Sequence, residues 1–194
     1  MIRIGFTGCP GSGKTSTARA LAAFCRSIDS LKRVELIPEY ARRYIAKYGP
    51  ITSIADQYRI MEKQIQWEDS IPQEETDILI SDSPIHMGWL YVMECYPLKN
   101  QKELMYSNDV FKRLNKLNLP PRYDIVFHLP PVIAPIKDGV RSELHFDEKW
   151  RESSNNRIKF IFNLFPPLKF IEITSVGLKE RVEDCITHLS EHLS

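Results

Sequence analysis

Hydrophobic residues follow two patterns that alternate along the chain. Short, almost purely apolar runs are typical of buried strands, and longer stretches with apolar residues at helical spacing are typical of helices packed on a sheet. Their alternation predicts an α/β domain with a mostly parallel sheet. The expected strands are 2–7, 34–37, 77–81, 123–129 and 169–174. The expected helices are 14–26, 39–48, 54–70, 101–117 and 178–193.

The length of the chain bounds its domain organisation. Its 194 residues suit one domain with its own core, so we expect a single domain over 1–194. A long stretch rich in charged residues separates the last two expected strands. Connections of that length inside a compact domain are usually functional. We therefore expect a lid over residues 131–163.

The charge balance limits the classes of partner. There are 26 basic and 25 acidic residues, which argues against a dedicated nucleic-acid or membrane-surface binder. No apolar run reaches the length of a membrane span, and the start of the chain does not resemble a signal peptide. The four cysteines are widely spaced, which favours free thiols in a reducing compartment. We expect a cytoplasmic protein.

One motif points directly to chemistry. Residues 8–15 read G-C-P-G-S-G-K-T and satisfy G-x-x-x-x-G-K-[ST], the phosphate-binding P-loop, between an expected strand and an expected helix. Glycines let backbone N–H groups point at phosphate oxygens, and the helix N-terminus adds positive potential. Lys14 would reach the β and γ phosphates of ATP, and Thr15 would bind Mg²⁺. The expected nucleotide-binding residues are Gly8, Gly11, Ser12, Gly13, Lys14, Thr15 and Ser16.

The surrounding sequence favours one class of P-loop protein. A GTPase would carry N-K-x-D, but residues 115–118 read N-K-L-N. A motor ATPase usually ends a strand in Asp-Glu, whereas no second acid follows Asp82 here, which favours transfer to a bound hydroxyl over hydrolysis. We expect Asp82 to act on Mg²⁺ together with Thr15 and to accept the proton of the acceptor hydroxyl. The alternative is that Asp82 caps a helix before Pro84.

Four ordered features resemble a known group. They are the P-loop at 8–15, E-Y-A-R at 39–42, Asp82, and D-G-V-R at 138–141. Together they resemble the ribosylnicotinamide kinase domain and its relatives, small kinases that act on nucleoside-type acceptors and include bacteriophage members. The resemblance implies a three-layer P-loop NTPase fold of the kinase type, with a parallel five-stranded sheet, a lid segment, and ATP and Mg²⁺ as cofactors. It places the protein in a bacterial or phage-infected cytoplasm.

The acceptor site is expected beside the second strand. Glu39 would face the cleft at the carboxyl edge of the sheet and accept hydrogen bonds from sugar hydroxyls. Arg42, one helical turn away, would be its partner or a phosphate ligand; the alternative is a surface ion pair. Tyr40 and Trp89, and also Tyr58, are candidates for stacking on a base, although aromatics in such helices commonly belong to the core. Weaker candidates are Gln57 and His86.

Arginines of the expected lid are candidates for catalysis. An arginine that closes over the transferred phosphoryl group stabilises its charge. Arg141 occupies the D-G-x-R position of the resembled family, and Arg151 is the second candidate, with Arg157 as an open alternative. These charges could instead form a solvated helix face.

Three hypotheses follow. The leading one is a kinase with a small nucleoside-type substrate, in which Asp82 is the base and Lys14 and Arg141 stabilise charge. A second keeps the chemistry but changes the acceptor to a hydroxymethylated pyrimidine in DNA, as in some phage relatives, with a basic track for the phosphate backbone. The track would comprise Lys99, Lys102, Lys112, Arg113, Lys116 and Arg122. A third is a regulatory nucleotide-binding module with little turnover, which would need neither Asp82 nor the lid arginines.

Overall fold

The computed structural model describes residues 1–28, 33–95, 101–134 and 147–193. Within these ranges five strands form one sheet in the order β2-β3-β1-β4-β5, and every neighbouring pair is parallel. The strands are β1 (Ile2–Thr7), β2 (Val34–Ile37), β3 (Ile78–Ser81), β4 (Ile125–His128) and β5 (Lys169–Glu172). The predicted parallel five-stranded sheet is confirmed.

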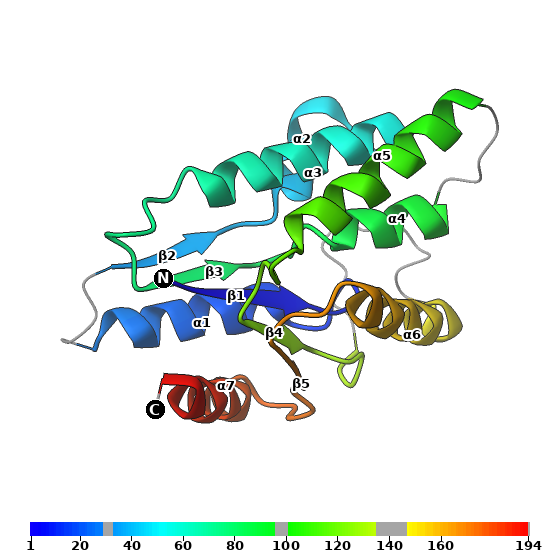
Figure 1. Ribbon diagram of the computed structural model, residues 1–194. Coiled ribbons are helices and arrows are strands. Elements are labelled where there is room, and N and C mark those ends of the chain that lie inside the picture. The colour runs from blue at the N-terminus through cyan, green and yellow to red at the C-terminus, as the bar shows by residue number, and fades with distance from the viewer. Residues whose placement is uncertain (29–32, 96–100, 135–146, 194) are drawn as a thin grey trace.

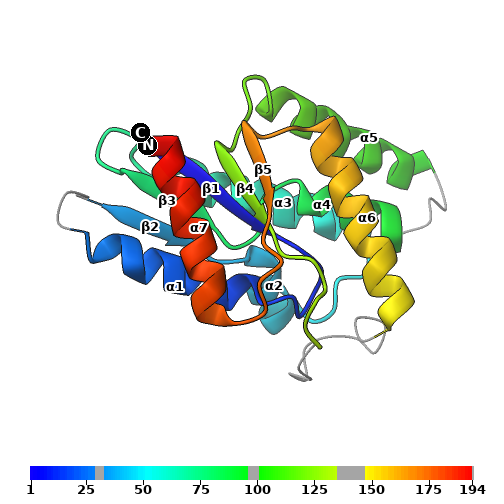
Figure 2. The ribbon, with the colours of Figure 1, turned by 90° about the horizontal axis from the view of Figure 1, so that it is seen from below.

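Helices cover both faces of this sheet and give three layers (Figure 1). Figure 2 shows α1 and α7 lying across one face, while α3 to α6 lie on the other. The helices are α1 (Lys14–Arg26), α2 (Tyr40–Tyr48), α3 (Ile54–Asp69), α4 (Met87–Cys95), α5 (Gln101–Leu117), α6 (Glu148–Leu164) and α7 (Leu178–Leu193).

The central strands β3 and β4 are mostly apolar because both of their faces are buried. Ile125 and Phe127 of β4 pack into the core formed with α1 and α7. Val126, which points to the opposite face, belongs to the core formed with α3 to α6. Successive side chains of a strand alternate between faces, so a strand covered on both sides needs a continuous apolar run.

The stretch expected to form a lid contains α6, which the sequence analysis did not predict. The helix begins after Asp147, whose Oδ1 accepts a hydrogen bond from the backbone N–H of Trp150 at 2.7 Å. Its residues Ile158, Ile161 and Phe162 are buried in the core beneath. The part of the expected lid at 131–163 that forms α6 therefore packs into the core, and the lid itself stays a prediction. Residues 135–146 lie outside the described residues.

The described cysteines Cys9, Cys25 and Cys185 are buried free thiols, as their spacing predicted. Burial raises the pKa of all three thiols, that of Cys185 to about 12, so they stay protonated and unreactive. In the part of the chain that the structure describes, no helix has an apolar stretch long enough to cross a membrane.

Candidate active site

The strand order brings three sequence-predicted features to one edge of the sheet. In a parallel sheet the loops that follow the strands meet at the carboxyl edge, where ligands bind. The P-loop follows β1, Glu39 follows β2, and Asp82 follows β3. Ser81 at the end of β3 pairs with Gly5 of β1 on one side and with Ile37 of β2 on the other. Asp82 therefore lies between Glu39 and the P-loop.

The P-loop has the backbone that its glycines allow. Gly8, Gly11 and Gly13 have φ angles of 145°, 80° and 94°, a region that other residues rarely adopt. Gly13 is also the N-cap of α1, so the helix begins at Lys14 with its amino end toward the loop. The Lys14 ammonium donates hydrogen bonds to the carbonyl oxygens of Gly8 at 2.8 Å and Cys9 at 3.1 Å. The loop and its lysine thus form a compact cationic turn.

A residue that the sequence analysis missed holds this loop from below. Arg181 of α7 is 2% exposed and donates to the carbonyl oxygens of Ser12 at 2.7 Å and Ser175 at 2.6 Å. A side chain at Gly13 would collide with the same guanidinium. Arg181 therefore ties the P-loop to the segment that follows β5. Because 169 residues separate Arg181 from Ser12, no local motif could have revealed this contact.

Asp82 is a buried carboxylate in a mixed electrostatic field. Its side chain is 4% exposed, and burial, with a further contribution from the charge of Glu39, raises the pKa of Asp82 to about 6. A hydrogen bond from Thr15 and the positive charges of Lys14 and Arg42 oppose that rise. The helix α4 begins only at Met87, so Asp82 is not its N-cap and that alternative is wrong. Charges and hydrogen bonds of the P-loop and the charge of Glu39 both shift the pKa of Asp82.

Magnesium fits the oxygen atoms of this site. The described residues hold no cluster of three or more His, Cys, Asp or Glu side chains for a metal ion. Mg²⁺ beside nucleoside triphosphates does not need one, because it keeps several waters and binds one or two protein oxygens plus phosphates. Asp82 Oδ1 is buried and has no hydrogen-bond partner among the described residues, and the Thr15 hydroxyl interacts with the same carboxylate.

Five of the nine buried polar side-chain atoms that lack a partner in the described ranges belong to residues of the P-loop and its surroundings; the others belong to Arg3, Thr76 and His86. Buried polar side-chain atoms nearly always have hydrogen-bond partners, and leaving one unsatisfied costs about 1–3 kcal/mol. Within the described ranges such atoms include Ser12 Oγ, Asp82 Oδ1, His128 Nδ1, Arg151 Nε and Arg181 Nη2. Several unsatisfied donors and acceptors at one sheet edge are what a site for a highly polar ligand requires.

Arg151 approaches the P-loop from α6. It is 5% exposed, donates to the carbonyl oxygen of Ile133 at 2.8 Å, and interacts with the Cys9 thiol of the loop. Arg157 of the same helix is exposed. Of the two arginines that the sequence left open, Arg151 therefore lies against the loop. Arg141, the first candidate, lies outside the described residues together with the rest of D-G-V-R at 138–141.

A small hollow of about 30 Å³ opens beside the Asp82 turn. Glu39 and Tyr40, two of the residues expected at the acceptor site, line this hollow. Glu39 also pairs with Arg42 across 3.0 Å, so both expected roles of this carboxylate are compatible with the structure. The hollow has a mixed lining of amide, aromatic and apolar side chains. Further lining residues include Gln57, Met61, Gln64, Met87 and Tyr91.

Several aromatic candidates lie elsewhere. Trp89 does not line this hollow; its ring packs against Phe111 at a centroid distance of 5.5 Å, so its predicted acceptor role is corrected. Tyr58 packs near Tyr106. His86 is buried among aromatic rings, and burial lowers its pKa to about 3, which marks a core residue. Helical spacing identifies an apolar face but not the cavity that the face borders.

The expected basic track is only partly exposed. Arg113 pairs with Glu62 at 3.0 Å, and Arg122, whose side chain is 7% exposed, pairs with Glu68 and Asp69. Lys112 and Lys116 are exposed. Lys99 and the side chain of Lys102 lie outside the described residues. Two of the cations counted toward a DNA track therefore serve internal ion pairs.

Comparison with known families identifies the domain. A family described as AAA domain matches residues 3–181. The chain belongs to the AAA domain family. A comparison with curated proteins gives no match.

The fold of this AAA domain is shared with solved kinases. A deoxyadenosine kinase from M. mycoides is 19% identical, with a TM-score of 0.66 over 98% of this chain and 100% of that chain. A thymidylate kinase from Ehrlichia chaffeensis is 16% identical, with a TM-score of 0.64 over 97% and 98%. A NadR protein in complex with NR is 18% identical, with a TM-score of 0.72 over 98% of this chain and 49% of that chain. At these identities the likeness establishes the fold, that of P-loop kinases.

Proposed function

We propose that this AAA domain is an ATP- and Mg²⁺-dependent phosphotransferase that passes the γ-phosphoryl group to a hydroxyl of a nucleoside-type acceptor. The observation that carries this proposal is the position of Asp82. Its carboxylate interacts with Thr15 and Lys14 of the P-loop and with Glu39, which lines the neighbouring hollow. A single buried acid that interacts with both a phosphate-binding loop and a residue of a neighbouring hollow suits transfer between two bound substrates.

The solved structures with a similar fold support a nucleoside-type acceptor. Two of them are a deoxyadenosine kinase and a thymidylate kinase, and the third is a NadR protein solved with NR. Their fold matches that of this chain over nearly its whole length. In this domain a nucleoside-type acceptor would bind at the hollow that Glu39 and Tyr40 line beside the Asp82 turn.

The P-loop residues bind and orient the triphosphate in this mechanism. Backbone N–H groups of the loop, which Pro10 lacks, and the amino end of α1 bind phosphate oxygens, and Lys14 turns from the loop carbonyls toward the β and γ phosphates. Thr15 and Asp82 would hold a magnesium ion, which would supply positive charge to the phosphate oxygens. Arg151, and Arg141 by the family resemblance, stabilise charge on the transferred group.

The acceptor residues place and activate the hydroxyl. Glu39 accepts hydrogen bonds from the acceptor, and Tyr40 forms one wall of its site. Asp82 accepts the proton of the attacking hydroxyl as the new O–P bond forms. In the site without metal or nucleotide, the pKa of about 6 leaves the Asp82 carboxylate ionised at neutral pH, the form that accepts a proton.

The test is transfer of labelled γ-phosphate from ATP with magnesium to two sets of acceptors. One set holds free nucleosides and nucleotides, including ribosylnicotinamide, and the other holds DNA with ordinary or hydroxymethylated pyrimidines. We expect label on a free nucleoside-type acceptor. If label appears on DNA alone and this transfer falls steeply with added salt, the acceptor is a base in DNA and not a free nucleoside. Release of label only as inorganic phosphate, independent of any acceptor, would refute the phosphotransferase.

A further inference from the structure

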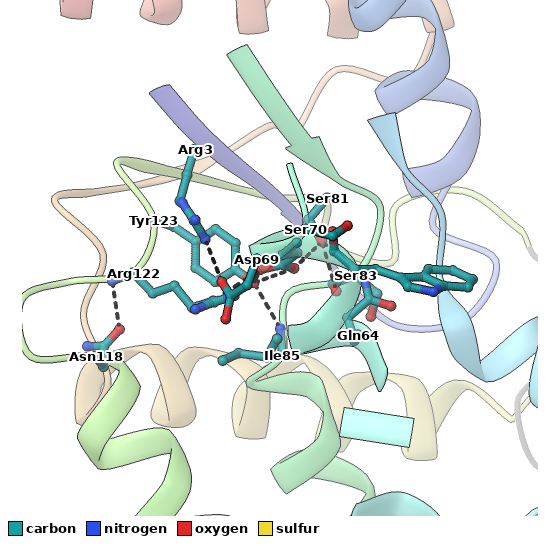
Figure 3. Close-up of polar contacts among 12 residues, drawn as sticks. Arg3, Gln64, Asp69, Ser70, Ser81, Ser83, Ile85, Asn118, Arg122 and Tyr123 are labelled. Carbon is teal, nitrogen blue, oxygen red and sulfur yellow. Dashed lines mark hydrogen bonds and ion pairs between the residues drawn. The ribbon is translucent and has the colours of Figure 1, made fainter. Parts of the chain in front are cut away.

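A second buried carboxylate contacts the residue before Asp82, and Figure 3 labels its partners Ser81, Arg122 and Tyr123. Glu68 of α3 is 0% exposed. It accepts hydrogen bonds from the hydroxyls of Ser81 at 2.7 Å and Tyr123 at 2.9 Å, and from Arg122 Nε at 3.0 Å. All of its partners are side chains fixed on other elements of the domain.

The donors to Glu68 fix the turn that carries Asp82. Ser81 immediately precedes Asp82, and its hydroxyl oxygen also lies 3.2 Å from the carbonyl oxygen of Ser83. The Tyr123 hydroxyl accepts a hydrogen bond from the backbone N–H of Ile85 at 3.1 Å. Glu68 thus controls contacts on both sides of Asp82.

The same network reaches the acceptor hollow through Gln64. This residue is 4% exposed, lines the hollow, and lies on α3 one turn before Glu68. Its amide nitrogen donates to Ser81 Oγ at 3.4 Å, and its amide oxygen accepts from the backbone N–H of Tyr40 at 2.9 Å. The start of α2, which carries Glu39, is therefore linked to the residue that precedes Asp82.

We infer that Glu68 is a positioning residue that holds Asp82 and, through Gln64, Glu39 in the relative placement needed for transfer. The inference rests on the proposed function. Stability alone is a weak reason for such a group, because apolar residues can often replace a buried ion pair without loss. The contacts of Glu68 instead converge on the two segments that carry the candidate base and the acceptor carboxylate. A displacement of about 1 Å at such a site can lower a rate about 10²-fold.

The test compares Glu68→Gln with Val110→Ala, a control in which a fully buried side chain of α5 is shortened outside the network. We expect Glu68→Gln to lower kcat by about 10- to 100-fold with KM for ATP unchanged. Val110→Ala is expected to lower Tm while kcat stays near wild type below the transition. Retention of wild-type kcat in folded Glu68→Gln would overturn the inference.

Hydrogen exchange separates this inference from the proposed function. We expect amides of 81–85 and 39–41 to exchange faster in Glu68→Gln than in Val110→Ala, with α1 and α7 unchanged. If the variants show this exchange pattern but the wild-type protein transfers no phosphate, the proposed function is refuted. The finding that Glu68 holds the segments 81–85 and 39–41 in place would still stand. If Glu68→Gln does not fold, Tyr123→Phe removes one donor and takes its place, with the same two outcomes.

Discussion

Glu68 and Asp82 are both almost completely buried carboxylates, yet their surroundings are opposite. Hydroxyl and guanidinium donors from three residues satisfy Glu68. Asp82 Oδ1 has no partner among the described residues, and the acidic Glu39 lies near enough to raise its pKa. The first carboxylate completes a closed network, and the second is left with capacity to bind something else.

The difference shows how one domain separates support from chemistry. A fully satisfied network specifies one arrangement of its segments. An unsatisfied acid destabilises the fold but remains available to a proton or a cation, which is why perturbed groups gather at functional sites. Arg122 and Arg151 repeat the contrast: the former pairs with Glu68 and Asp69, whereas Nε of the latter is unpartnered within the described residues.

Removal of the closed carboxylate should produce the largest loss of stability. Glu68→Ala leaves the buried Arg122 and the Tyr123 hydroxyl without their main acceptor, so we expect the free energy of unfolding to fall by about 3–5 kcal/mol. Urea unfolding followed by circular dichroism measures this change. Asp69→Ala, at a site with a side chain 48% exposed, is the control and should lose far less. Equal losses of stability in Glu68→Ala and Asp69→Ala would show that the buried Glu68 matters no more than an exposed partner of Arg122.

Removal of Arg151 should impair catalysis more than stability. Arg151→Ala is expected to lower kcat by about 10²–10³-fold, the range found when one charge-stabilising donor is lost, with ATP affinity little changed. Arg157→Ala, on the exposed side of α6, is the matched control. Steady-state kinetics with the acceptor that the transfer assay reveals would measure both variants, and an equal loss in the two would contradict the assignment.

Asp82→Asn should stabilise the fold, opposite in sign to the Glu68 variant. Because the pKa of Asp82 is raised from 3.8 to about 6, the folded state binds its proton more tightly, and wild type loses stability as pH rises through this window. Without nucleotide or magnesium, we expect the free energy of unfolding of Asp82→Asn to exceed that of wild type by up to about 3 kcal/mol at pH 8. The difference should vanish near pH 4. Urea unfolding at both pH values tests this, and a destabilised variant at pH 8 would contradict it.

Local sequence patterns predicted the parts of the site that depend on local geometry. The P-loop spacing specifies its own turn, and the apolar strand before Asp82 places that residue at the sheet edge. Contacts between distant residues were missed, as for Glu68 with Tyr123, 55 residues apart, and Arg181 with Ser12. Helix α6 was missed because its buried face begins with the polar Arg151 and Ser154, which hides the apolar period.

The central claim is that Asp82 takes part in transfer and is not needed for nucleotide binding. Single-turnover transfer of labelled phosphate by wild type and Asp82→Asn, with ATP affinity measured on the same samples, tests it most directly. We predict a rate about 10²–10⁴-fold lower in the variant, with ATP still bound. Transfer within about threefold of wild type, less than any general base normally contributes, would contradict the account.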